Sequence, residues 1–122
     1  MDAGAGGNVD LLMRLMSAST ERARVSSSNI ANASTPGYRR QIVQFENVLR
    51  DKISQGATLE DLSGIQPSVV EDTISPGKPD GNNVNLELEI NTERQNRLLY
   101  ETYAALLQSH FDMIETSIQA GR

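Results

Sequence analysis

The sequence contains no cysteine and no tryptophan, and these absences remove several classes of protein at once. Without cysteine there is no disulfide, no thiolate nucleophile and no cysteine-based metal site. Three tyrosines and two phenylalanines are the only aromatic residues among 122. Aromatic side chains supply much of the buried apolar area in a small domain, so we expect the isolated chain to have a weak core.

Long apolar runs are also missing. No run approaches the roughly 18 residues that a membrane-spanning helix needs, so we expect no membrane span. The first residues are small and glycine-rich, with neither a basic region nor an apolar stretch after it. We therefore expect residues 1–8 to be disordered, and we expect any export from the cytoplasm to proceed without a cleaved signal peptide.

The chain offers little that could carry out catalysis. The formal net charge is −5 and no basic stripe is present, which argues against nucleic acid as a partner. His110 is the only histidine, and it lies in an apolar stripe with no second ligand or nucleophile beside it. The acidic pairs Glu60/Asp61 and Glu71/Asp72 are expected on a solvated surface. The sequence thus predicts no catalytic residue, no cofactor, no metal and no enzyme.

Two long amphipathic patterns are present instead, one near each end of the chain. Apolar or small residues recur at alternating spacings of four and three, as in a heptad seam, and predict helices over residues 9–35 and 84–122. We expect a mainly α protein with one long helix near each end. The residues predicted to pack helices or subunits together are Leu12, Met16, Ile30, Leu86, Ile90, Tyr100, Leu107, Phe111, Ile114 and Ile118.

The middle of the chain has weaker signals. Residues 36–55 combine a turn with a short amphipathic segment, and Gly56 is expected to end it. Residues 56–83 are punctuated by proline, glycine and asparagine, and we predict a mostly irregular, flexible linker that becomes ordered on assembly. A short strand near residues 66–71 is the alternative for part of this segment.

A distinctive stretch marks the end of the first helix. Pro36 disfavours a helical conformation at the preceding residue, and Gly37 can adopt the positive φ that a type II turn requires. Asn29 and Asn32 share one helical face, where their amides can bond carbonyl groups left free by the ending helix or N–H groups of the turn. Local physics alone favours an ordinary helix stop followed by a turn.

The same stretch resembles the signature of the rod, hook and related axial proteins of the bacterial flagellum. The segment 79–87, followed by Leu98-Leu99-Tyr100, is similar to one short proximal rod protein of this family, and the sister rod protein FlgC is the alternative. The resemblance assigns an assembly motif to Asn29, Ile30, Asn32, Thr35, Pro36, Gly37 and Tyr38.

This resemblance implies a structural subunit that is exported without a cleaved signal and assembles helically into the rod in the periplasm. It also implies that the two terminal helices pair as an antiparallel coiled coil. It implies torque transmission and a role in the wall of the export channel. The implied partners are other copies of the chain, rod proteins such as FlgC and FlgF, the junction protein FliE and the flagellar type III export apparatus. A soluble helical adaptor or secretion chaperone, acting as a small oligomer, is the competing interpretation.

Overall fold

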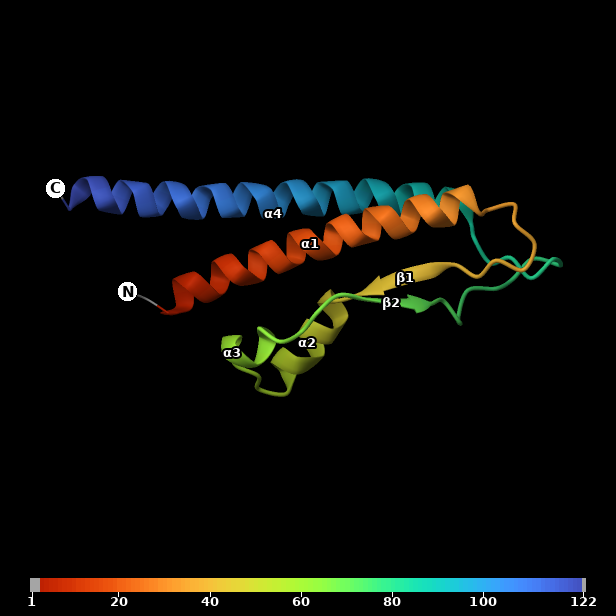
Figure 1. Ribbon diagram of the computed structural model, residues 1–122, viewed down its shortest axis with the longest axis horizontal. Coiled ribbons are helices and arrows are strands. Elements are labelled where there is room, and N and C mark those ends of the chain that lie inside the picture. Colours follow the sequence, from red (N-terminus) through yellow and green to blue (C-terminus); the bar gives the residue numbers. More distant parts are fainter. Residues whose placement is uncertain (1–2, 122) are drawn as a thin grey trace.

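The computed structural model describes residues 3–121 and is dominated by two long helices. Helix α1 spans Ala3–Ala31 and helix α4 spans Leu86–Ala120. They run in opposite directions, lie together near the end of α1 and diverge toward the chain termini (Figure 1). The predicted mainly α fold with antiparallel terminal helices is confirmed. Within residues 3–121, no helix is both long enough and apolar enough to cross a membrane.

A smaller layer lies on the other side of α1 from α4 (Figure 1). Its elements are strand β1 (Gln41–Gln44), helix α2 (Glu46–Ser54), helix α3 (Leu59–Leu62) and strand β2 (Ser68–Glu71). The two strands form an antiparallel sheet in which Gln41 lies opposite Glu71 and Gln44 lies opposite Ser68. Gly56 has a φ of +87° and follows the end of α2, as the sequence predicted.

The apolar core is small and lies between α1 and this smaller layer. Its buried members are Ala18, Phe45, Leu49 and Leu62, and Leu11 and Leu15 pack against them. Arg14 of α1 donates a hydrogen bond from Nη1 to the carbonyl oxygen of Ile65 at 2.7 Å. The first half of α1 therefore buries its apolar side against α2 and α3.

The contact between α1 and α4 has a different character, because its buried residues are polar. Those of α4 are Glu89 and Asn96, and they meet a face of α1 that buries Ser19, Ser26 and Asn29.

Only part of the predicted apolar seam of α4 meets α1. Tyr100 lines a groove with Ser19 and Ala23 of α1, whereas Leu86 and Ile90 are 48% and 38% exposed. Glu89, one position before Ile90, forms hydrogen bonds with Asn29 and Arg40.

Two predicted boundaries of the first helix need correction. Residues 3–8 are helical, although the sequence predicted a disordered start, and residues 1–2 lie outside the described chain. Helix α3 lies against this turn of α1, where a Cβ on Gly7 would come 3.2 Å from Cδ1 of Leu59. At the other end the helix stops at Ala31, and turns occupy the next residues. The side chain of Asn32 bonds the carbonyl oxygen of Ser28 there, which competes with continuation of the helix.

The segment 56–83 is mostly irregular, as predicted, and it contains α3 and the short strand β2 that was the alternative for residues 66–71. The loop after β2 is held by hydrogen bonds to other parts of the chain. The sequence does not reveal these bonds, because the partners of this loop are 40 to 50 residues away in the chain.

Candidate functional site

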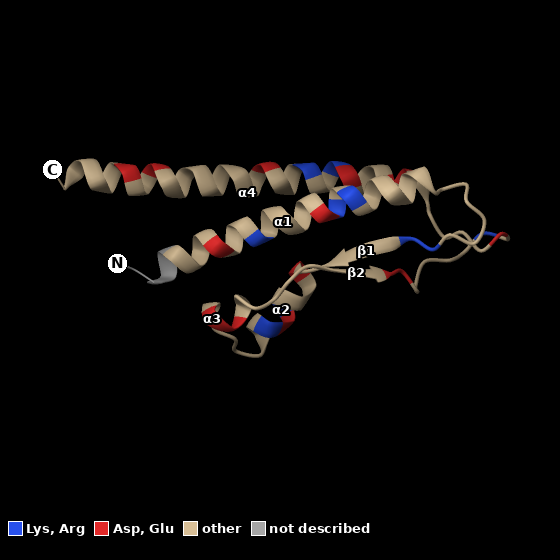
Figure 2. Ribbon diagram, in the orientation of Figure 1, with Lys and Arg blue, Asp and Glu red and all other residues tan. Residues whose placement is uncertain are grey.

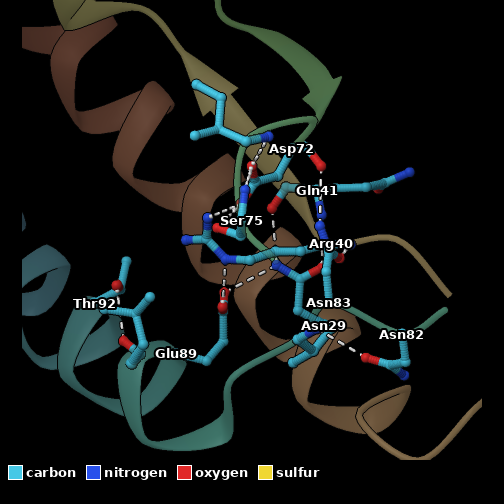
Figure 3. A network of polar contacts seen from close by, with 12 residues as sticks. Asn29, Arg40, Gln41, Asp72, Ser75, Asn82, Asn83, Glu89 and Thr92 are labelled. Atoms are coloured by element: carbon cyan, nitrogen blue, oxygen red, sulfur yellow. Dashed lines mark hydrogen bonds and ion pairs between the residues drawn. The ribbon is translucent and has the colours of Figure 1, made fainter. Parts of the chain in front are cut away.

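A cluster of polar side chains joins the end of α1 to the start of α4 (Figure 3). It also includes the residues just before β1 and just after β2. We call it the polar junction; its members are Asn29, Arg40, Gln41, Asp72, Ser75, Asn82, Asn83 and Glu89. One residue of the predicted assembly motif, Asn29, belongs to it.

Asn29 connects three elements from a fully buried position. Its Nδ2 donates to the carbonyl oxygen of Gln41 at 2.8 Å and to Oε1 of Glu89 at 2.9 Å. Its Oδ1 accepts from the backbone N–H of Gln41 at 2.9 Å and from the hydroxyl of Tyr38 at 3.2 Å. These four contacts use both donors and both acceptor sites of the amide, so Asn29 fixes β1 and α4 to the end of α1.

Arg40 supplies the positive charge of the junction. Its Nε donates to Oε2 of Glu89 at 2.7 Å and its Nη1 donates to Oδ2 of Asp72 at 3.0 Å. Burial by itself would lower the pKa of Arg40, but the hydrogen bonds and charges of Glu89 and Asp72 outweigh burial and raise it. The Glu89 side chain is 2% exposed, so its charge depends on Arg40 for compensation.

Asp72 was expected on a solvated surface, and the structure corrects this, because its side chain is 6% exposed. The hydroxyl of Ser75 donates to Oδ2 at 2.6 Å. The backbone N–H groups of Ser75 and Ile74 donate to Oδ1 at 3.0 and 2.9 Å. These hydrogen bonds, together with the one from Arg40, hold the pKa of the Asp72 carboxyl well below its ordinary value. The carboxylate therefore stays ionised in the folded chain.

Two consecutive asparagines complete the junction from the loop before α4. The Nδ2 of Asn82 donates to the carbonyl oxygens of Asn32 at 2.9 Å and Thr35 at 2.8 Å. These two carbonyl groups of the turn also accept from the backbone N–H groups of Thr35 and Tyr38. The Oδ1 of Asn83 accepts from the backbone N–H of Arg40. The loop is thus bonded to the assembly motif and to Arg40, two residues after it.

The turn within the motif has the predicted geometry. The backbone N–H of Tyr38 donates to the carbonyl oxygen of Thr35 at 3.2 Å, and Gly37 has a φ of +74°. Asn32 bonds the carbonyl oxygen of Ser28 at 2.8 Å, as its position on the helix suggested. The type II turn and the predicted hydrogen bond from Asn32 to a carbonyl group at the helix end are therefore confirmed.

The turn lies close to the loop that precedes α4. The N–H of Gly37 donates to the carbonyl oxygen of Asp80 at 2.8 Å. A Cβ on Gly81, whose φ is +88°, would come 3.4 Å from Cα of Gly37. The two glycines therefore allow a close approach of two backbones that are more than 40 residues apart.

The remaining motif residues lie nearer to solvent. Ile30 is half-buried, and Pro36 is exposed. Sequence reasoning missed most of the junction, because Arg40, Asp72, Asn82, Asn83 and Glu89 had been given local roles or none. A pair of asparagines directly before the last helix was the available signal.

The chemistry of the junction is structural. Its carboxylates are bonded to Arg, Asn and Ser groups, and no cluster of His, Asp or Glu suited to a metal ion occurs in the described part of the chain. Asn29, Arg40 and Asn83 instead hold four backbone segments in one relative orientation. The arrangement determines the direction in which the chain leaves α1.

A second candidate surface lies on the last part of α4, far from the junction. We call it the distal apolar face; its members are Leu98, Leu99, Tyr100, Leu106, Phe111, Met113, Ile114 and Ile118, with exposed fractions from 41% to 64%. Figure 2 shows the basic residues of α4 only in its first half, so the charges along residues 98–121 are acidic.

The predicted packing residues divide between covered and open positions. Leu12, Met16, Ile30 and Leu107 are half-buried, and Leu86, Ile90, Tyr100, Phe111, Ile114 and Ile118 are exposed. His110 is half-buried and lines a shallow groove with Met113, Ile114 and Ile118. Of the exposed residues, Tyr100 lines a groove with Ser19, Thr20 and Ala23 of α1, and the other five are 38% to 56% exposed.

Comparison with known proteins gives a consistent result. The family described as flagella basal body rod protein matches residues 13–39, which include α1 from Met13 onward and the assembly motif. The chain is 31% identical to the flagellar basal body rod protein FlgB of Aeromonas hydrophila, over 77% of this chain and 79% of that protein. It is 29% identical to FlgB of Borrelia hermsii, over 92% and 96% of the two chains. The FlgB of Bacillus subtilis is 25% identical, over 95% and 96%.

Proposed function

Because the chain belongs to the family of flagellar basal body rod proteins called FlgB, we propose that it is a structural subunit of the proximal rod. The family places it in the flagellar basal body as a component that assembles with other basal body proteins. The proposal adds a specific part of the rod, a helical mode of assembly and named contact surfaces.

The observation that carries this proposal is the distal apolar face. Eight large apolar side chains between Leu98 and Ile118 of α4 are 41% or more exposed, whereas isolated monomers seldom expose large apolar patches. Burying a side chain of this size stabilises an interface by roughly 1.5–3 kcal/mol. Neighbouring subunits would supply the missing partner surface, and the exposed Leu86, Ile90, Tyr100, Phe111, Ile114 and Ile118 would belong to that interface.

The assembly motif has a different task in this proposal. Through Asn29 and Asn82 it fixes the angle at which the chain turns away from α1. A helical assembly repeats one contact many times, so an error in that angle would be repeated in every subunit. The motif therefore gives each copy the same shape before the apolar surfaces meet.

The finer assignments follow from the family and remain part of the proposal. The partners are other copies of the chain, the rod proteins FlgC and FlgF, the junction protein FliE and the type III export apparatus. The subunit reaches the periplasmic rod without a cleaved signal, transmits torque and contributes to the wall of the export channel. The chain needs no cofactor for this role.

An experiment in the bacterium that carries the gene tests the proposal. The double substitution Ile114→Asp and Ile118→Asp places two charges on the distal apolar face. We expect cells with this variant as their only copy to lack assembled rods in electron micrographs of isolated basal bodies and to be non-motile. The purified variant should keep the circular dichroism spectrum and urea midpoint of the parent, because both residues are exposed in the single chain.

The matched control is Ser109→Asp, which adds a charge to the same half of α4 at an exposed polar position. We expect this variant to assemble and to swim. Normal rods with the double variant would contradict the proposed interface. In sedimentation, a fixed small oligomer of the purified parent chain would favour the adaptor or chaperone interpretation instead.

A further inference from the structure

The contact between α1 and α4 contains a second set of polar interactions outside the junction. Asn96 of α4 is 5% exposed, and its Nδ2 donates to the carbonyl oxygen of Ser19 at 2.8 Å. Its Oδ1 accepts from Nη1 of Arg22 at 3.1 Å. The Nη2 of the same arginine donates to Oε2 of Glu46 at the start of α2. Asn96 therefore connects α4 to α1 directly and to α2 through Arg22.

The spacing of these contacts matches that of the junction. Arg22 and Asn29 are one heptad apart on α1, and Asn96 and Glu89 are one heptad apart on α4. Two antiparallel helices that are bonded at both positions have a single relative register. We infer that Asn96, together with Arg22, is a positioning element that selects this register of the α1–α4 pair.

Apolar contacts between α1 and α4 would not select one register of the helix pair in the same way. The buried residues of α4 are the polar Glu89 and Asn96, and the residues of α1 that bond them include the buried Asn29 and the carbonyl group of the buried Ser19. The hydroxyls of Ser19 and Ser26 are buried without a hydrogen-bond partner in residues 3–121. A buried polar residue in a helical seam specifies register at some loss of stability, and this contact shows both properties.

Both alternative registers leave buried groups without partners. If α4 slipped by one heptad in one direction, Asn29 would face Asn96, and Glu89 would lose the amide that it accepts from. In the other direction Arg22 would face Glu89, but Asn96 would face the apolar Leu15 and Arg40 would lose Glu89. In each slipped state, a charged group that has a partner in the observed register would lose that partner.

The aromatic residue one heptad beyond Asn96 supports this geometry. Burial raises the pKa of the Tyr103 hydroxyl, and the nearby carboxylate of Glu46 raises it further. Tyr103 therefore continues the same row of α4 toward α2, so a slip of the helix would also separate this pair.

The register can be measured on the isolated chain by distances between two spin labels. The protein contains no cysteine, so Ser27→Cys on α1 and Ser109→Cys on α4 give two unique and exposed labelling positions. A slip of one heptad moves the labels by about 10 Å along the helix axis. Dilution with unlabelled protein restricts the measured distances to single molecules.

We expect the parent chain to give one distance and the Asn96→Leu variant to give a second peak displaced by about 10 Å. The control Asn91→Leu changes an exposed asparagine on the same helix and should give the parent distance. Asn96→Asp keeps an acceptor for Arg22, so this variant should also keep the single distance.

Two results would overturn the inference. One is a single, unchanged distance in Asn96→Leu. The other is loss of helix in this variant by circular dichroism, because a residue that only selects the register is not needed for the helices to form. The measurement uses the free chain and is independent of rod assembly. The register inference can therefore fail while the proposed function stands, and the reverse also holds.

Discussion

The polar junction and the distal apolar face invert the usual distribution of side chains in a folded protein. At the junction, Asn29, Asn82 and Glu89 are at most 2% exposed. On the distal apolar face, Leu98 and Met113 are each 64% exposed. Proteins that act as monomers normally bury the second kind of residue and expose the first. The single chain thus forms the hydrogen bonds and ion pairs of the junction by itself, and it leaves the apolar side chains of the distal face exposed.

This division has a physical reason. Hydrogen bonds and ion pairs depend on distance and angle, so they fix a shape, whereas apolar burial depends mainly on area and tolerates several arrangements. A subunit whose shape is fixed internally can present an apolar surface that is nonspecific by itself. The relative orientation of α1, the strands and α4 then decides where that surface meets a neighbour.

The largest effect in this comparison is expected from removing the charge of the junction. Arg40→Met leaves the carboxylates of Glu89 and Asp72 buried without compensation, and we expect a loss of about 3–5 kcal/mol in the free energy of unfolding. Urea denaturation of the free chain measures this loss. On the distal face, Met113→Ser should change the same quantity by less than about 0.5 kcal/mol, because the side chain is mostly exposed.

The control for Arg40→Met is Arg50→Met, which removes an exposed arginine from α2. Equal effects of the two arginine substitutions would show that the junction does not depend on the charge of Arg40. A large loss with Met113→Ser would contradict the assignment of the distal face as open in the single chain.

A smaller effect is expected at the turn that adjoins the junction. Gly37→Val places a β-branched residue at a φ of +74°, which costs on the order of 1–3 kcal/mol. Nothing lies within 4 Å of the added Cβ, so the loss arises from backbone strain and not from a clash. We expect circular dichroism to show nearly the parent helix content, while cells with this variant as their only copy lose motility.

Gly64→Val is the matched control, since its added Cβ also meets nothing within 4 Å and Gly64 does not have a positive φ. This variant should leave motility intact. Normal motility with Gly37→Val would show that the turn geometry is not required for assembly.

The acid sensitivity of the junction gives a third and smaller effect. The pKa of Asp72 is lower in the folded chain than its unfolded value of about 3.9, so its contribution to stability is complete above that pH. The contribution is lost as the pH falls below that value and the carboxylate becomes protonated. We expect Asp72→Asn to lower the urea midpoint at pH 7 and to approach the parent midpoint near pH 2.

Asp51→Asn serves as the control for the pH series, because Asp51 is an exposed residue of α2. Its difference from the parent should be small at every pH. A constant deficit of the Asp72→Asn variant across the series would mean that the ionisation of Asp72 does not stabilise the fold.

The sequence predicted the elements of this molecule better than their contacts. The heptad patterns located both long helices, and Pro36 with Gly37 located the turn, because these signals lie within a few residues of the structure that they cause. The fold class and the exposed apolar character of the last helix also followed from spacing alone.

The junction could not be predicted in the same way, because the bonds of Glu89 with Asn29 and Arg40 and of Arg40 with Asp72 join residues that are 32 to 60 positions apart. Glu89 has the properties of an ordinary acidic residue at a helix start, and Asp72 those of a surface acid. Arg40 bonds both carboxylates, so both side chains can be buried. Glu89 therefore occupies the contact with α1 at the start of α4 and Leu86 and Ile90 stay exposed, a distribution that the apolar spacing does not reveal.

The smallest effect concerns a buried hydroxyl in the polar contact itself. Ser26 is 2% exposed, and its Oγ has no hydrogen-bond partner among the described residues. We expect Ser26→Ala to raise the free energy of unfolding by about 1 kcal/mol, because an unsatisfied buried group is removed and alanine favours the helix. The neighbouring exposed Ser27→Ala should gain only the helix-propensity part, roughly 0.5 kcal/mol, in the same urea titration. The difference between the two variants measures the stability lost by keeping the contact between α1 and α4 polar. If Ser26→Ala were less stable than Ser27→Ala, the hydroxyl of Ser26 would stabilise the contact between α1 and α4 instead of destabilising it.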